Sequence, residues 1–266
     1  MGADIKALRT RIKSVDSTLH LTKAMGLVAS SKLRRSNENM LRALKYSQGL
    51  EQIVDTLTAC SECRKSPYLK QSGERVRIII IAGDRGLAGG YNANVFRLAR
   101  QYEGAEFIPL GKRACDRYGC EIVSSEHFSG AQAYGLAKKL CDDFVAGEFD
   151  RLGIISTRYV SLMLQQADIS WVLPLAVKED AQTISAVFEP DEETILAAAV
   201  PEYVAGVIMA AVRESFASEV AARRMAMDNA GKNATQMIDT LQLEYNRARQ
   251  GAITQEITEI VAGSGN

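Results

Sequence analysis

The chain has 266 residues, of which 47% are apolar and 24% charged, and these proportions are typical of a soluble globular protein with one sizeable core. Its purely apolar runs are shorter than the roughly 18 residues needed to cross a bilayer, so neither a membrane span nor a secretory signal is expected. The five cysteines are an odd number in a long chain, which excludes a disulfide-stapled scaffold and indicates reduced thiols in a cytosolic compartment.

The net charge of zero conceals a separation of charge between the two ends of the chain. Residues 1–45 hold 10 Lys or Arg and 3 Asp or Glu, whereas residues 178–266 hold 7 and 14. A basic segment is able to bind nucleic acid, but this one has no aromatic residue before Tyr46 on which bases could stack. We therefore expect no nucleic acid, and expect the basic end to pair with an acidic partner, the acidic C-terminal end included.

The first segment has the apolar spacing of a coiled-coil helix. Its apolar residues alternate at steps of three and four, and no proline occurs before Pro67. The spacing predicts a helix from about residue 4 to about residue 58, within a coiled-coil segment that covers residues 1–60. Polar residues, Pro67 and Gly73 then indicate a linker over residues 61–73. The apolar positions of the seam are Ile5, Leu8, Ile12, Val15 and Leu19.

The middle of the chain alternates predicted strands with predicted helices. The β-branched run 75–81 ends at Gly83-Asp84 and is typical of a buried strand. This alternation indicates an open α/β sheet domain of Rossmann-like type over residues 74–190. Further strands are predicted at 106–110, 120–124, 151–159 and 165–175, and helices at 93–102 and 131–145.

The last segment, residues 191–266, is predicted to be a second coiled-coil helix. The steps of three and four return between Val220 and Leu241, and Pro201 is the last proline, so the helix is expected from about 201 to about 260. A helix of that length would measure about 90 Å. Such a rod is too long to be buried on its own domain, so we expect it to pair with the N-terminal helix and to project into a partner. Its end keeps an apolar face through Ile253, Ile257 and Ile260.

The sequence contains only weak matches to motifs for nucleotide or metal binding. The glycine-rich loop 83–90 lies where a phosphate-binding loop would lie, but it fits neither common glycine pattern and lacks a Lys-Ser/Thr pair. A structural glycine turn is the favoured interpretation, and nucleotide binding the alternative. Cys60 and Cys63 form a C-x-x-C without a second ligand pair, and His20 and His127 are scattered. We therefore predict no catalytic residues, no cofactor and no metal.

Three parts of the chain carry longer motifs. The N-terminal motifs are Ile12-Lys13-Ser14-Val15, Thr22-Lys23-Ala24-Met25 and the stretch 28–35. The C-terminal motifs are Ala217-Ser218-Glu219, Ala221-Ala222-Arg223, Ala226-Met227, Tyr245-Asn246, Ala248-Arg249-Gln250 and the stretch 253–261. The middle motifs are Asp84-Arg85-Gly86-Leu87 with Gly89-Gly90, and Phe188-Glu189-Pro190. With these motifs, both ends of the chain closely resemble the gamma subunit of F-type ATP synthases, and the middle matches it more loosely.

The resemblance implies a rotor shaft. The two terminal helices would form an antiparallel coiled coil inside a ring of three alpha and three beta subunits, and the α/β domain would be a foot that contacts the epsilon subunit and the membrane c ring. The chain would transmit torque and so couple ion flow to ATP synthesis or hydrolysis, without a catalytic site of its own, because ATP is made on beta. It would lie at the cytoplasmic side of a bacterial cell membrane without inserting into it.

The resemblance also implies contact residues. The shaft would meet the beta subunits through Met25, Lys32, Arg34, Arg35, Glu219 and Arg223, and would meet them higher in the ring through Arg249, Gln250 and Thr254. In the expected register Met25 lies near Arg223 and Val15 near Asn233. A solvated basic helix face is the alternative for Lys32, Arg34 and Arg35. At the level of the whole chain, the alternatives are a non-rotary coiled-coil adaptor and a nucleotide-dependent enzyme that uses the glycine loop.

Overall fold

The computed structural model describes residues 2–60, 62–70, 73–177 and 189–263. Phe188, at the end of the predicted sheet domain, lies outside the described residues. Two helices account for both ends of the chain: α1 covers Gly2–Thr58 and α5 covers Glu192–Gly263. The chain divides into two compact units, one formed by Met1–Ala29 with Arg224–Asn266 and the other by Ser30–Arg223.

The first unit is a pair of antiparallel helices. A Cβ placed on Gly26 would lie 3.7 Å from the Cβ of Met227, and one placed on Gly231 would lie 3.8 Å from side-chain atoms of Leu19 and Thr22. Leu19 and Met227 are buried at this seam. The predicted coiled coil is therefore present, but its register differs from the expected one. Position 26 faces 227 rather than 222, a displacement of about 1.4 helical turns.

The second unit is built on a four-stranded mixed sheet with the order β2-β1-β3-β4. The strands are β1 (Val76–Ile81), β2 (Glu106–Leu110), β3 (Arg151–Tyr159) and β4 (Gln165–Leu173). Strand β1 pairs parallel with β2 and with β3, and β3 pairs antiparallel with β4. Three of the predicted strands thus agree closely with the structure, and the fourth ends two residues early.

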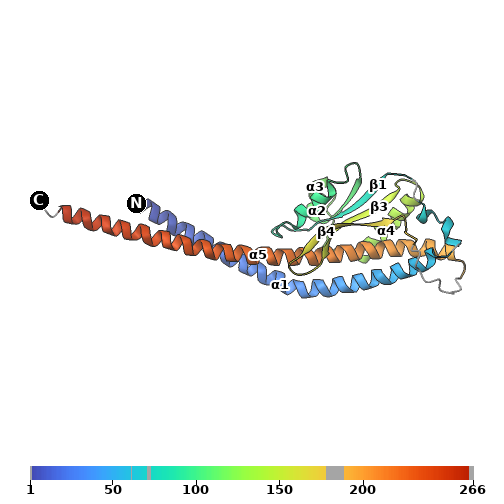
Figure 1. The fold of residues 1–266 in the computed structure, drawn as a ribbon, viewed down its shortest axis with the longest axis horizontal. Coiled ribbons are helices and arrows are strands. Elements are labelled where there is room, and N and C mark those ends of the chain that lie inside the picture. Colours follow the sequence, from blue (N-terminus) through green and yellow to red (C-terminus); the bar gives the residue numbers. More distant parts are fainter. Residues whose placement is uncertain (1, 61, 71–72, 178–188, 264–266) are drawn as a thin grey trace. The chain divides into compact units, whose positions relative to one another are not determined.

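Helices cover both faces of this sheet (Figure 1). Alternate residues of β1 point to opposite faces, with Ile79 and Ile81 in one core and Ile78 and Ile80 in the other. The first core also holds α4 (Gly130–Val145), the end of α1 and the part of α5 between residues 196 and 212. The second core holds α2 (Tyr91–Ala99) and Ala114 of α3 (Lys112–Tyr118). The unit is therefore a three-layer α/β structure in which the terminal helices supply part of one layer.

One prediction about the middle of the chain is wrong, and one helix was missed. Residues 120–124 form no strand, because Gly119 ends α3 in the left-handed conformation with φ of 70° and the chain leaves it as a loop. Only isolated bonds tie that loop down, such as that from Gly111 N to Val123 O at 2.8 Å. Helix α3 was not predicted, since it spans only seven residues. The linker region also contains two short 3-10 helices, Glu62–Lys65 and Pro67–Leu69.

Helix α5 starts at Glu192 rather than near 201, and Pro201 lies inside it. The start is capped by Asp191, whose Oδ1 accepts a hydrogen bond from Thr194 N at 2.8 Å. The helix also contains an 18-residue window with a mean hydropathy of 2.0, which by length and composition alone would be sufficient for a membrane span. This window was not predicted, because Pro201 and Glu202 interrupt its apolar residues. In the structure 44% of it is buried, and the fully buried Leu196, Val204 and Ile208 belong to the core on the sheet.

Candidate functional site

The glycine-rich loop after β1 is organised by Asp84, whose carboxylate accepts four hydrogen bonds. Oδ1 accepts from Lys112 N at 2.9 Å and from Ser125 N at 3.0 Å. Oδ2 accepts from Ser124 Oγ at 2.6 Å and from Glu126 N at 3.0 Å. Burial raises the pKa of Asp84, but these bonds outweigh burial and hold the pKa below its usual value. The ionised side chain thus joins the loop to α3 and to the segment 124–126.

The same loop is held to α5 by Glu219 and Arg223, two of the predicted contact residues. Nε and Nη2 of Arg223 both donate to Gly86 O at 3.2 Å, and Arg223 forms a close ion pair with the buried Glu219. A Cβ on Gly83 would lie 2.7 Å from the Glu219 carboxyl carbon, so a larger residue there would have to displace that buried carboxylate. In this loop the Gly86 carbonyl accepts hydrogen bonds from α5, and Gly83 lies close to the Glu219 side chain of α5. Both contacts are made within the chain, which supports the structural interpretation of the glycines. We call Gly83, Gly86, Glu219 and Arg223 the clamp.

Hydrogen bonds next to the clamp tie α5 to the sheet. Ser215 Oγ accepts from Thr157 N at 3.0 Å, and Ser218 Oγ donates to Thr157 O at 3.1 Å. The buried Tyr91 hydroxyl donates to Ser215 O at 3.0 Å. Buried hydrogen bonds of this kind fix one geometry, because breaking any of them leaves a polar group without water. The middle of α5 is thus fixed to β3 and α2 by directional bonds in addition to apolar packing.

The predicted basic residues of α1 have different environments. Lys32 Nζ lies 2.6 Å from Glu126 Oε1. Burial raises the pKa of Glu126, but the Lys32 bond and charge outweigh burial and keep it below its usual value. Arg34 is 90% exposed and pairs with Glu38 of its own helix at 3.2 Å. Arg35 is exposed and forms no ion pair among the described residues. Lys32 is therefore engaged within the second unit, whereas the two arginines face solvent.

The remaining predicted residues belong to the first unit. Met25 is half-buried, whereas Arg249, Gln250 and Thr254 are exposed. Thr254 Oγ1 donates to Gln250 O at 2.9 Å, a bond within the helix that leaves the outer face open. Beyond them α5 exposes Ile257 and other apolar side chains to solvent. An apolar helix face without cover is typical of a surface that meets another chain.

The buried thiol of Cys63, in the C-x-x-C pair, is not activated. Burial, then neighbouring Cys60 and acidic residues, raise the pKa of Cys63 to about 11. A thiol with so high a pKa stays protonated at neutral pH and is a poor nucleophile and metal ligand. Within the described part of the chain, no three His, Cys, Asp or Glu residues are grouped as a metal would require.

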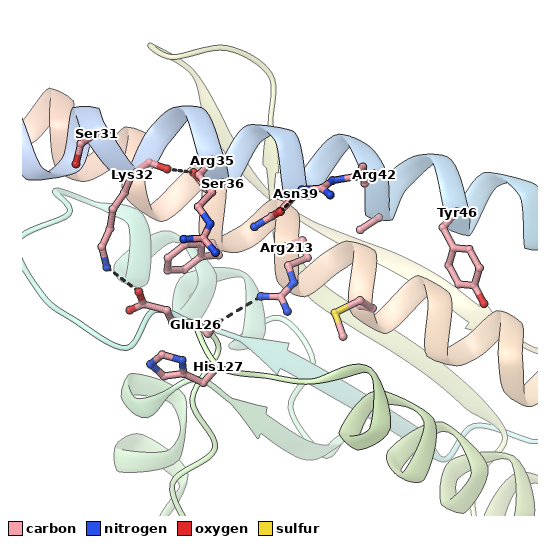
Figure 2. Close-up of a pocket in the computed structure, with 13 residues that line it drawn as sticks. Ser31, Lys32, Arg35, Ser36, Asn39, Arg42, Tyr46, Glu126, His127 and Arg213 are labelled. Atoms are coloured by element: carbon pink, nitrogen blue, oxygen red, sulfur yellow. Dashed lines mark hydrogen bonds and ion pairs between the residues drawn. The ribbon is translucent and has the colours of Figure 1, made fainter.

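A polar hollow lies between α1, α5 and the segment 126–127 of the second unit (Figure 2). Its volume is about 900 Å³. It was not predicted, because no local pattern around Arg213 of α5 shows that it meets α1 and the segment 126–127. The residues around it are Ser31, Lys32, Arg35, Ser36, Asn39, Arg42, Ala43, Tyr46, Glu126, His127, Met209, Arg213 and Phe216.

Comparison with known proteins identifies the family. A family model described as "ATP synthase" matches residues 4–265. An "ATP synthase gamma chain" from Moorella thermoacetica is 39% identical over 277 residues, covering 98% of both chains, and one from Ruminococcus albus is 37% identical over 282 residues, covering 99% of both. The chain belongs to the ATP synthase gamma chain family. As a gamma chain it is part of the central shaft of an F-type ATP synthase.

Solved structures agree with this gamma chain in fold. A chain in the cryo-EM structure of the Euglena gracilis mitochondrial ATP synthase, comprising OSCP, F1 and c-ring, superposes with a TM-score of 0.70 at 19% identity and covers 99% of this chain and 94% of that one. A Tetrahymena thermophila chain titled central stalk and c-ring superposes with a TM-score of 0.64 over 79% of this chain. The predicted combination of an α/β sheet and a terminal coiled coil is confirmed.

Proposed function

We propose that this gamma chain transmits torque between a membrane c ring and the beta subunits of a three-plus-three ring of alpha and beta, with catalysis on beta. In this proposal residues 74–190 are the foot, which meets the epsilon subunit and the c ring, residues 61–73 are a linker, and residues 1–60 and 191–266 are the shaft. Ion flow at the c ring is thereby coupled to ATP synthesis or hydrolysis. The complex lies on the cytoplasmic side of a bacterial membrane.

The observation that carries the proposal is the continuity of α5. One helix of 72 residues contains the fully buried Leu196 and Ile208 on the sheet, the clamp, and the exposed Ile257 and Ile260 near its end. A twist applied to the sheet domain reaches α5 through the clamp and the Ser215 and Ser218 bonds. An unbroken hydrogen-bonded helix then transmits it along its axis, as a loop could not.

We propose that the contacts with beta use Met25, Lys32, Arg34, Arg35, Glu219 and Arg223 and, higher in the ring, Arg249, Gln250 and Thr254. The exposed Arg34 and Arg35 are suited to carboxylates on a partner, because guanidinium groups bind them in a bidentate manner. Glu219 and Arg223 act through the clamp, since Glu219 is buried and their polar atoms are used within the chain. As the shaft turns, each beta subunit meets a different face and shifts between open and closed states.

Two disulfides distinguish a rotor from a fixed adaptor. The first joins Leu87→Cys, at the exposed tip of the glycine loop, to a cysteine introduced into a facing beta subunit. The second is internal and joins Gly26→Cys to Met227→Cys, where the Cβ separation of 3.7 Å suits a disulfide. Both are made in a Cys120→Ser background, because Cys120 is the exposed native thiol.

A rotor whose foot is locked to beta cannot turn. ATP hydrolysis by the complex should be lost on oxidation of the Leu87→Cys pair and should return on reduction. The internal disulfide leaves every moving interface free, so hydrolysis should survive it. Full hydrolysis with the foot locked to beta would reject rotation and favour the coiled-coil adaptor.

A further inference from the structure

The hollow beside Lys32 has an excess of positive charge, and only Lys32 and Arg35 of its cations belong to the proposed contacts with beta. Lys32, Arg35, Arg42 and Arg213 surround it, against the single carboxylate of Glu126. Lys32 is paired with that carboxylate at 2.6 Å. Among the described residues none of the three arginines forms an ion pair, so three guanidinium groups around one recess have no anionic partner there.

Arg213 is the most buried of the three arginines. It comes from α5 and donates only to backbone carbonyls, to Phe128 O at 2.8 Å and to Glu126 O at 3.3 Å. Burial lowers the pKa of Arg213 below its ordinary value, although a guanidinium stays charged at neutral pH. A half-buried cation without a counter-charge is costly, and an anion in the hollow would offset that cost.

The arginines on α1 stand above the same recess. Arg35 and Arg42 are separated by seven residues, which is two helical turns, so they leave the helix on one face. Asn39 lies between them and accepts a hydrogen bond from Arg42 Nη2 at 2.7 Å through Oδ1, which leaves the two N–H groups of its amide as donors (Figure 2). Tyr46 is 57% exposed at the end of the row.

We propose that this hollow binds a polyphosphate group, either as a free inorganic chain or as the phosphate chain of a nucleotide. Planar guanidinium groups match phosphate oxygens in bidentate pairs, and cations on two sides of a recess favour a ligand with several linked negative charges over a single one. The volume of about 900 Å³ lies within the range of small-molecule pockets. The exposed Tyr46 ring offers a surface on which a base could stack.

A small polyanion is favoured over an acidic segment of another chain. The cation with the largest uncompensated burial, Arg213, lies on α5 behind the row formed by α1, and a compact phosphate chain reaches it without bringing a polypeptide backbone into the recess. This site is separate from the glycine-rich loop, whose Gly86 carbonyl is taken by Arg223.

The test is isothermal titration calorimetry on the full-length chain at physiological salt, with tripolyphosphate, metal-free ATP and adenosine as separate ligands. We expect saturable binding of tripolyphosphate and of ATP and none of adenosine. Equal affinities would identify the phosphate chain as the whole ligand, and tighter binding of ATP that is lost in Tyr46→Leu would identify a nucleotide.

Two matched variants separate the site from general charge. Arg35→Gln with Arg42→Gln should weaken tripolyphosphate binding by about tenfold or more, because each removes a charge-assisted bond. The control, Arg97→Gln on α2 with Arg100→Gln at its C-cap, makes the same charge change at exposed positions and should have less than about a twofold effect. Both pairs are on the surface and should keep the melting temperature. Arg213→Gln, checked for folding by circular dichroism, should abolish binding.

Three outcomes would overturn the proposal. They are no saturable binding of tripolyphosphate or ATP, an equal loss of affinity in the α1 and α2 variants, or binding of an acidic peptide at Arg35 and Arg42 that tripolyphosphate does not displace. None of them bears on rotation, which the foot disulfide tests independently.

Discussion

Two stretches of α5 have the same kind of apolar pattern, but one stretch is buried and the other is exposed. Between 196 and 212 an apolar residue recurs every fourth position, and Leu196, Val200, Val204, Ile208 and Val212 are all fully buried on the sheet. Near the end of the helix Ile253, Ile257 and Ile260 recur at steps of four and three and are 43–70% exposed. A periodic apolar face therefore shows that a helix will be covered, but not whether its own chain or a partner covers it.

The largest expected effect comes from truncating one residue of each stretch. Ile208→Ala removes a fully buried side chain and should lower the free energy of unfolding by about 2–5 kcal/mol. Ile257→Ala, which is 57% exposed, should change it by less than about 0.5 kcal/mol. Urea denaturation followed by circular dichroism measures both. If a partner covers the end of α5, Ile257→Ala should instead weaken association with the alpha and beta ring. Similar losses of stability in the two variants would contradict the contrast between the two stretches.

The clamp separates the two stretches and should respond to a single methyl group. In Gly83→Ala the new Cβ would lie 2.7 Å from the Glu219 carboxyl carbon, and relieving that contact should cost about 1–3 kcal/mol of stability. Gly135→Ala is the control, because Gly135 lies inside α4 with nothing within 4 Å of a new Cβ. The control should stabilise by about 0.5–1 kcal/mol, as expected for alanine in a helix. Thermal melting of both variants tests the close approach.

The two carboxylates of this region should respond to pH in opposite directions. The pKa of Asp84 is held low, so its stabilisation is present above the unfolded value of about 3.8 and is lost as pH falls through the lower folded value. Burial raises the pKa of Glu219 despite Arg223, so its ionisation opposes folding above that raised value, and the penalty disappears as pH falls toward 4.5.

Unfolding free energies measured from pH 3 to pH 7 test this pair of effects. Asp84→Asn should cost about 1–3 kcal/mol at neutral pH, since the amide cannot accept all four bonds, and the difference from the parent should shrink in acid. Glu219→Gln should cost less at pH 7 than at pH 4. The same pH slope for both differences would contradict the assigned directions.

The smallest effect on stability is expected at the exposed arginines. Arg34→Glu with Arg35→Glu removes one exposed pair, that of Arg34 with Glu38, which contributes about 0–1 kcal/mol. The charge reversal should nevertheless weaken ATP-driven ion pumping in the assembled complex, because attraction to a partner carboxylate becomes repulsion. Lys138→Glu with Lys139→Glu on the exposed face of α4 is the matched control. Normal pumping in a fully assembled complex would show that Arg34 and Arg35 do not contribute to the contacts with beta.

Apolar periodicity was sufficient to predict the long helices and most of the sheet. The steps of three and four in α1 and α5, and the β-branched run of β1, are local signals that tertiary packing reinforced. Pro201 misplaced the start of α5, because a proline usually marks a helix boundary and here the helix continues through it. The run 120–124 has strand-like residues, but Gly119 and the bonds at Val123 hold it as a loop.

The candidate site was predictable only in part. Glycines after a strand pointed to a special loop, but the clamp depends on Gly86 meeting Arg223, 137 residues away, and no local pattern encodes that contact. The bond between Lys32 and Glu126 and the cations around the hollow likewise come from packing of distant segments. Residues whose environment is set by their own helix were therefore easier to predict than residues whose partners are distant in the sequence.

The core on one face of the sheet also constrains how the chain is made. Ile79, Ile81 and Ile154 leave the ribosome well before Leu196, Val204 and Ile208, which complete their cover. Until the last third of the chain has been synthesised, an apolar face stays open on the nascent sheet, and transient exposure of that kind promotes aggregation. The nascent chain should therefore depend on chaperones up to the emergence of α5, and truncation before residue 196 should leave an insoluble product.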